Sequence, residues 1–261
     1  MTQTTIPTLH HLAHAQSLRI SWALEEIQLA DPTFHYHQKN YPRTIQNTDL
    51  TKVHRLGKSP ILTLETTDGS APPTIQLDPG VLSESSLILE FLNAEYANGL
   101  WTPASLEEER RSVFFADFAT SSLLHKVDFC VVFESPAQFA PFPFNLLFAV
   151  LAYPMLSRFL ADLLAIFRLL EDALSDRFPY FSGARLGVAD INMSFGMDMA
   201  EQRGYVSFED GRFPKLKGWG ERIRAREGYR RAVAKSGGYD LKTFGMRGGW
   251  AMVFGGGLME G

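Results

Sequence analysis

Cysteine, strong net charge and long apolar runs are all scarce in this sequence of 261 residues. Its single cysteine, Cys130, excludes an internal disulfide and a cysteine-based metal site, and indicates a buried thiol in a reducing compartment. The 29 acidic and 25 basic side chains leave a net charge of −4, which gives no broad attraction for nucleic acid or anionic membranes. The first seven residues lack the charged-then-apolar order of a secretion signal. We therefore expect a cytoplasmic protein whose partners are small molecules rather than nucleic acid.

The most apolar part of the chain, residues 142–170, is interrupted too often to predict a membrane span. Pro143 and Pro154 enclose only ten residues, and Arg158 and Asp162 follow, whereas a spanning helix needs about 20 apolar residues. The segment therefore predicts buried helices or the wall of an apolar pocket, and we expect no membrane partner.

The first hundred residues predict a small α/β domain. Apolar residues alternate over short runs, which is typical of strands, or recur every three to four residues, which is typical of helices. The expected elements are a strand at 6–12, a helix at 17–29, strands at 34–37, 60–64 and 74–77, and a helix at 85–96. The Asp68-Gly69 turn between the last two strands predicts an antiparallel hairpin, so the order is βαβ followed by ββα.

Beyond the Pro103 segment the periodicity is helical up to residue 235. Helices are expected at 105–133, 144–177, 188–203 and 214–235, with breaks at 136–143, Pro154, Pro179 and Gly204. The last seventeen residues contain seven glycines, a composition that disfavours ordered structure. We therefore assign residues 1–100 to the α/β domain, 101–240 to an all-helical domain and 241–261 to a Gly-rich tail.

Several motifs resemble the glutathione transferase superfamily. Residues 53–60 (VHRLGKSP), with Leu82-Ser83-Glu84-Ser85 further on, look like its glutathione-binding half, and residues 183–195 resemble the folding motif of its helical domain, in which Asp190 reaches back to cap a helix. The insertion at 140–144 is similar to one in fungal members of the yeast Gtt-like and nitrogen-regulator-like group. The resemblance covers residues 8–240 and implies a thioredoxin-like N-terminal domain, an all-helical domain, glutathione as cofactor and a homodimer.

The residues of these motifs suit a tripeptide. Pro60, at the head of a strand, can hold a cis peptide that turns the backbone of Ser59 outward to pair with the cysteinyl residue. Glu84 can meet the ammonium of the γ-glutamyl end and Ser85 its carboxylate, while the resemblance implies that Lys58 reaches the glycyl carboxylate. Helix capping by Ser85, dipole stabilisation by Glu84 and solvation of Lys58 are the alternatives. The cofactor-binding residues expected on this basis are Arg19, His54, Lys58, Ser59, Pro60, Glu84 and Ser85.

A transferase must present glutathione as a thiolate, because a free thiol with a pKa of about 8.5 is mostly protonated at neutral pH. In many members of the family a Ser, Tyr or Cys between the first strand and the first helix supports the thiolate, but Ala15 occupies the position expected for that serine. Ser17 is the nearest hydroxyl, and an N-cap role competes with a catalytic one. His14 and Gln16 are the other catalytic candidates, and Arg19 can favour the anion or pair with an acid.

An aromatic stripe in the helical part predicts a hydrophobic second substrate, with core packing as the alternative. Its members are Phe114, Phe118, Phe129 and Phe133. No metal-ligand spacing recruits His10 or His11, so no metal is expected.

Three functions are consistent with these features. The first is a glutathione S-transferase that acts on a large apolar or conjugated electrophile. The second is a glutathione-dependent cis/trans isomerase of a polyene intermediate in fungal secondary metabolism. The third is a non-catalytic, glutathione-binding regulatory protein, because the fold does not dictate the function.

Overall fold

The computed structural model describes residues 3–43 and 48–242, which form two compact units. The first unit combines the chain up to Thr102 with Ile223–Tyr239. The second unit combines Pro103–Arg222 with the residues from Asp240 onward. All but the first two residues of the predicted Gly-rich tail, 241–261, lie outside the described residues.

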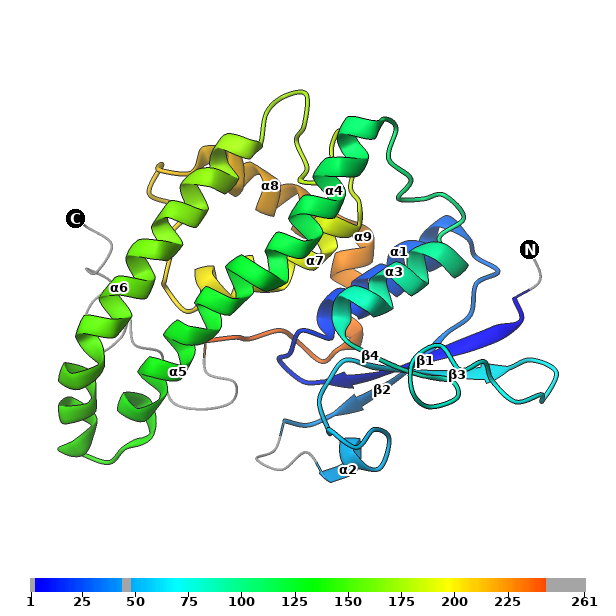
Figure 1. Ribbon diagram of the computed structural model, residues 1–261, viewed down its shortest axis with the longest axis horizontal. Helices are drawn as coiled ribbons and strands as arrows, with labels where there is room; N and C mark the ends of the chain where they lie inside the picture. Colours follow the sequence, from blue (N-terminus) through cyan, green and yellow to red (C-terminus); the bar gives the residue numbers. More distant parts are fainter. Residues whose placement is uncertain (1–2, 44–47, 243–261) are drawn as a thin grey trace. The chain divides into compact units, whose positions relative to one another are not determined.

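The first unit is built on a four-stranded mixed sheet with the order β2-β1-β3-β4 (Figure 1). β1 (Thr5–Leu12) pairs in parallel with β2 (His37–Tyr41) and antiparallel with β3 (Ile61–Thr66). β4 (Val81–Ser83) pairs antiparallel with β3. The predicted thioredoxin-like domain, with its βαβ and ββα halves, is confirmed.

Two long helices cover one side of this sheet, and a single turn of helix lies on the other (Figure 1). The long helices are α1 (Leu18–Ala30) and α3 (Ser85–Glu95), and the short one is α2 (Thr48–Thr51). All ten residues of α1 from Leu18 to Ile27 are buried, so this helix is enclosed on every side rather than along one apolar face.

Two strands lie further along the chain than their patterns predicted. β2 begins at His37, and the rings of Phe34 and Tyr36, which suggested the strand, stack at 6.0 Å in the core just before it. β4 begins at Val81 rather than at 74–77, because that segment pairs through the side chain of Gln76, whose amide bonds to the backbone of Ser83. At 34–36 the alternation reports burial rather than the backbone ladder, whereas at 74–77 it reports neither, because Ile75 and Leu77 are exposed.

The last helix in the described part of the chain belongs to the first unit. The helix predicted over 214–235 is two helices, α8 (Pro214–Ala225) and α9 (Glu227–Lys235), separated at Arg226 by an extended backbone. The Arg226 guanidinium bonds bidentately to the buried Glu26 carboxylate of α1 at 2.8 and 2.6 Å. Gly228 permits this approach, since a Cβ there would lie 2.7 Å from the same carboxylate.

A second ion pair holds the other end of α9 on the first unit. Lys235 donates to the buried Glu25 carboxylate at 3.0 Å and lies over the ring of Tyr36. Tyr36 also donates to Glu25, and burial raises the pKa of its hydroxyl. Between the two pairs, Tyr229 packs edge-to-face on Trp22 at 5.3 Å. We call this arrangement of Glu25, Glu26, Arg226 and Lys235 the α9 latch.

The second unit is helical, as predicted. The helices before α8 are α4 (Leu106–Phe118), the π-helical η1 (Ala119–Leu124), α5 (His125–Phe139), α6 (Phe144–Ala173) and α7 (Val188–Gln202). α5 continues past Pro136 and α6 past Pro154, where breaks were predicted. A proline removes one hydrogen bond, and the packing of α5 on α6 through stacked rings of Phe129 and Phe159 at 5.0 Å compensates for that loss.

Burial along α6 changes sharply at its middle. The predicted burial of residues 142–170 holds for the second half, where Leu160, Leu163, Phe167 and Leu170 are buried. In the first half the apolar side chains are mostly exposed.

Asp190 organises the centre of the second unit. Its fully buried carboxylate accepts hydrogen bonds from the N–H groups of Phe181, Ser182 and Gly187 and from the indole of Trp219, at 2.7 to 3.2 Å. Desolvation raises the pKa of this carboxyl, while the four donors favour its ionised form. The predicted capping role of Asp190 is confirmed by its bond to Gly187 at the start of α7.

A buried ion pair and the lone thiol complete the core of this unit. Arg203 pairs with Glu134, and both side chains have almost no exposed surface. Arg203 also donates to the carbonyls of Leu241 and Lys242, which fixes the last described residues. Cys130 is buried, as predicted, and desolvation raises the pKa of its thiol to about 12.

Candidate functional site

Three segments of the first unit meet at the side chain of Gln16. Its amide nitrogen donates to the carbonyl of Ser59, at the head of β3, at 3.4 Å. Its amide oxygen accepts from the hydroxyl of Ser85, the first residue of α3, at 3.4 Å and from the guanidinium of Arg19. The structure thus brings together four of the predicted site residues, which come from the β1–α1 loop, α1, the segment just before β3, and α3.

The head of β3 is anchored to β1 through Ser59. The Ser59–Pro60 peptide is cis. The Ser59 hydroxyl donates to the carbonyl of His10 at 3.1 Å and accepts from the N–H of Leu12 at 3.2 Å. Because the side chain is engaged with β1, the carbonyl of Ser59 is the group directed toward Gln16.

The turn into α3 has an unusual backbone at Glu84. Its φ of 69° and ψ of 116° lie in a region that residues other than glycine seldom adopt. Glu84 is exposed, and its side chain caps no helix and pairs with no residue in the described part of the chain. The strained turn therefore presents a carboxylate to solvent beside the hydroxyl and first-turn N–H groups of Ser85.

The loop between β1 and α1 is held by a residue that the sequence did not single out. Arg43 donates to the carbonyls of Ala13 and His14 at 3.3 and 3.1 Å, and burial lowers the pKa of its guanidinium. His14 has a positive φ of 52°, which turns the loop. Ala15 is buried in a core cluster with Leu50, so the position expected to carry a hydroxyl is apolar and enclosed. Nothing in the sequence around Arg43 marks it as a loop anchor.

Ser17 points into the interior of the first unit. Its hydroxyl is fully buried, lies 2.9 Å from Nδ1 of His11 and accepts from the N–H of Leu12 at 3.2 Å. It makes no capping hydrogen bond to α1, so the alternative of an N-cap role is not found. Burial lowers the pKa of His11 to about 4, and the imidazole is therefore neutral at pH 7.

Lys58 and His54 lie on the segment that leads to Ser59. Lys58 is exposed and forms no ion pair with any residue at 3–43 or 48–242. His54 is half-buried, and its Nδ1 accepts a weak bond of 3.4 Å from the N–H of Leu56. Lys58 thus presents an uncompensated positive charge next to the backbone of Ser59.

The four predicted substrate residues form two pairs, one on α4 and one on α5 of the second unit. Phe114 and Phe118 of α4 lie 5.6 Å apart, and Phe114 is half exposed. Phe129 and Phe133 of α5 both pack on Phe159 of α6, at 5.0 and 5.5 Å.

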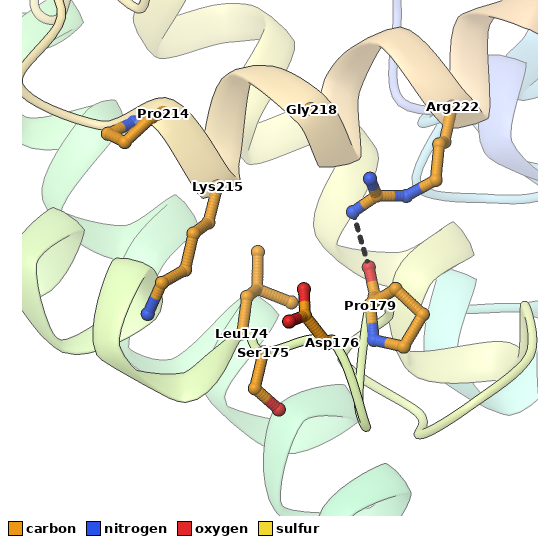
Figure 2. A pocket seen from close by; sticks show the side chains of 8 residues that line it. All are labelled: Leu174, Ser175, Asp176, Pro179, Pro214, Lys215, Gly218 and Arg222. Carbon is orange, nitrogen blue, oxygen red and sulfur yellow. Dashed lines mark hydrogen bonds between the residues drawn. The ribbon is translucent and has the colours of Figure 1, made fainter.

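The second unit also has a surface pocket of about 440 Å³ beside the start of α8 (Figure 2). Its lining residues are Leu174, Ser175, Asp176, Pro179, Pro214, Lys215, Gly218 and Arg222. Arg222 donates to the carbonyl of Pro179 at 2.8 Å. In the first turn of α8, the N–H groups of Lys215 and Leu216 donate to the carboxylate of Glu171. None of the predicted substrate residues lines this pocket. Within the described residues, no three His, Cys, Asp or Glu side chains are grouped closely enough to hold a metal ion.

Comparison with known proteins identifies similar sequences and folds. The family model for the glutathione S-transferase C-terminal domain matches residues 153–227. Glutathione S-transferase 1 of Saccharomyces cerevisiae is 22% identical over 87% of this chain and 94% of its own length. Glutathione S-transferase 3 of Schizosaccharomyces pombe is 26% identical over 87% of this chain and 86% of its own length. Ure2p5 from Phanerochaete chrysosporium, crystallised with 1-(S-glutathionyl)-2,4-dinitrobenzene, has a TM-score of 0.66 and 17% identity over 90% of this chain and 96% of its own.

Proposed function

We propose that this chain is a member of the glutathione transferase superfamily, and that its first unit binds glutathione and presents the thiolate to a hydrophobic, electrophilic or conjugated substrate. The observation that carries the proposal is the set of bonds made by Gln16. Its amide joins the carbonyl of Ser59 to the hydroxyl of Ser85, as one peptide-like ligand could do. In the complex, a peptide N–H of the ligand would donate to the carbonyl of Ser59 in place of the Gln16 amide nitrogen. A carboxylate of the ligand would accept from the hydroxyl of Ser85 in place of the Gln16 amide oxygen.

The charges around Gln16 match the ends of the tripeptide. In this proposal the γ-glutamyl carboxylate binds the Ser85 hydroxyl and the N-terminus of α3, and the exposed carboxylate of Glu84 meets the ammonium. The cysteinyl backbone pairs with Ser59 at the cis peptide before Pro60. Lys58 receives the glycyl carboxylate, and His54, on the same segment, is a second candidate for this contact.

Gln16 is also the best supported donor for the thiolate. Both of its bonds to Ser59 and Ser85 are long, at 3.4 Å, so exchanging them for bonds to a ligand costs little. Once released, the amide N–H group can donate to the cysteinyl sulfur, and the buried charge of Arg19 adds to its effect. His14 is the second candidate, while the hydroxyl of Ser17 is already engaged with His11.

The thiolate would attack an electrophilic carbon of the second substrate, and the aromatic rings of the second unit stay the predicted contacts for that substrate. Transfer leaves a stable adduct, whereas isomerisation requires addition to a conjugated alkene, rotation about the new single bond and elimination of the thiolate. The buried, apolar Ala15 favours a third candidate, a glutathione-binding protein without turnover, because the usual hydroxyl donor is missing.

Calorimetric titration with reduced glutathione tests the binding site. Ser85→Ala should raise Kd by about tenfold or more, since a hydrogen bond to a charged group contributes about 1.5–3 kcal/mol. Ser105→Ala is the matched control, because Ser105 also begins a helix but lies in the second unit, where it caps α4. Absence of heat at millimolar glutathione, or equal effects of both substitutions, contradicts the site.

Product analysis by mass separates the three functions. The chain is incubated with glutathione and a panel of electrophiles and conjugated polyenes. Adducts identify transfer, and a product of unchanged mass with glutathione undepleted identifies isomerisation. Binding without any product identifies the regulatory role. A homodimer and a cytoplasmic location stay predictions, and light scattering of the purified chain tests the first.

A further inference from the structure

The end of the α5–α6 hairpin carries an extensive exposed apolar surface. No charged residue occurs between Glu134 and Arg158, and we call residues 135–157 the hairpin tip. In Figure 1 this tip lies away from α4, α7 and α8 of the same unit. Ten large apolar side chains of the tip are 40–79% exposed, namely Phe139, Phe142, Phe144, Leu146, Leu147, Phe148, Val150, Leu151, Tyr153 and Met155.

These side chains surround the helix rather than form a flat face. Along α6 between Phe144 and Ser157, only Ala149 and Leu156 are buried. At 3.6 residues per turn, the exposed apolar residues cover roughly 220° of the helix circumference. A flat partner surface covers one side of a helix, whereas a fluid apolar phase contacts the whole arc.

Two amide side chains of the tip each have one polar atom turned away from its surface. Nε2 of Gln138 and Oδ1 of Asn145 are both inaccessible to solvent. In the connecting loop, the N–H of Ala140 donates to the carbonyl of Pro136, and Pro141 and Pro143 have no N–H. Within residues 140–143, Phe142 is therefore the one residue with an N–H that donates to no backbone carbonyl, which suits insertion into a medium that cannot accept hydrogen bonds.

The sequence predicted no membrane partner for this segment, but its exposure leads us to propose that the hairpin tip inserts into one leaflet of a phospholipid bilayer. α6 is the one helix in the described part of the chain that is long and apolar enough to cross a membrane by composition, yet only 28% of its most apolar window is buried. Its charge-free first half, Phe144 to Ser157, is about 21 Å long, which exceeds one leaflet but not a hydrocarbon core of about 30 Å. The tip therefore enters the bilayer without spanning it.

The depth of insertion and the lipid preference follow from the charged residues that flank the tip. Arg158 and the Lys126–Asp162 ion pair, at 2.7 Å, form the polar boundary at the level of the headgroups. These three side chains leave a net charge of only +1 at the boundary, so insertion depends mainly on apolar burial rather than on anionic lipid. This inference is independent of glutathione binding, since it uses residues of the second unit alone.

Fluorescence of a single labelled position tests the insertion directly. A thiol-reactive NBD probe is attached to the full chain carrying Phe142→Cys, while Cys130 is unreactive because it is buried and its pKa is raised to about 12. Neutral phosphatidylcholine vesicles should shift the probe emission to the blue. The same probe on Leu77→Cys, an 80% exposed position in the first unit, should not respond.

Vesicle flotation gives the quantitative comparison. Val150→Asp combined with Leu151→Asp should lower the vesicle-bound fraction by at least about tenfold, because two carboxylates would enter the bilayer. Leu77→Asp should leave it unchanged, and added salt should have no effect. The proposal fails if the chain does not float, or if it floats only with anionic vesicles at low salt. It also fails if the probe at position 142 emits in the blue without vesicles, because a second copy or residues 243–261 then cover the tip.

Discussion

Substituting Ser17 distinguishes a structural hydroxyl from a catalytic one. Ser17→Ala removes an oxygen that lies 2.9 Å from Nδ1 of His11 and accepts from the N–H of Leu12. Since this oxygen is fully buried and directed inward, we expect the substitution to destabilise the fold. Glutathione binding and thiolate formation should be unchanged.

The size of the effect follows from which partners are left unsatisfied. The N–H of Leu12 is also within 3.2 Å of the Ser59 hydroxyl, so it keeps a hydrogen bond. His11 loses the partner of its Nδ1, and a buried polar group without a partner costs about 1–3 kcal/mol. That loss corresponds to roughly 2–4 °C in Tm for each kcal/mol in a chain of this length.

Urea unfolding gives the stability change, and the absorbance of bound thiolate gives the catalytic one. Ser194→Ala is the control, because its hydroxyl is also buried but bonds only to a carbonyl of its own helix. A stable Ser17→Ala variant that binds glutathione weakly or shows no thiolate would refute the reasoning. It would mean that the hydroxyl faces the ligand.

Three further predictions concern stability. Lowering the pH from 7 to 5 should reduce the free energy of unfolding by about 2 kcal/mol through His11. Its pKa is about 4 in the fold and about 6.5 in the unfolded chain, so the unfolded chain takes up the proton first. Urea titrations at both pH values should show a smaller difference for His11→Asn. Asp190→Ala should cost more than about 3 kcal/mol, since four buried donors lose their acceptor, and little change in thermal unfolding would contradict its central role. Arg226→Met should cost about 3 kcal/mol by leaving the Glu26 carboxylate buried and unpaired, and a double-mutant cycle with Glu26→Gln should recover part of that loss.

Elements whose buried face coincides with their backbone geometry could be predicted from the sequence. The strand expected at 6–12, and the helices expected at 17–29, 85–96 and 188–203, lie within one or two residues of β1, α1, α3 and α7. The expected strand at 74–77 was misplaced because a glutamine side chain replaces the backbone ladder there. Helical periodicity also could not show that the chain breaks at one arginine and returns to the first unit.

The candidate site was predictable as a set of segments, but not as a set of side-chain directions. The motif around Pro60 and the Glu84-Ser85 pair indicated where the chain would meet, and the structure brings Ser59 and Ser85 to Gln16. Whether Ser17 faces outward depends on the turn at His14, where φ is positive. Arg43 fixes that turn from a distant part of the sequence, and a contact of this kind leaves no local pattern.

The α9 latch has a consequence for synthesis. A ribosome that has completed α3, which ends at Glu95, must still add the residues up to Glu227 before α9 begins. At about 5–20 residues per second this takes roughly 7–26 s. Throughout that interval the nascent N-terminal half exposes Trp22 and two carboxylates that are buried in the finished protein. A chaperone that binds nascent chains would bind this exposed surface. A message truncated before α9 would yield a chain in which Glu25 and Glu26 lack their basic partners and Trp22 stays exposed.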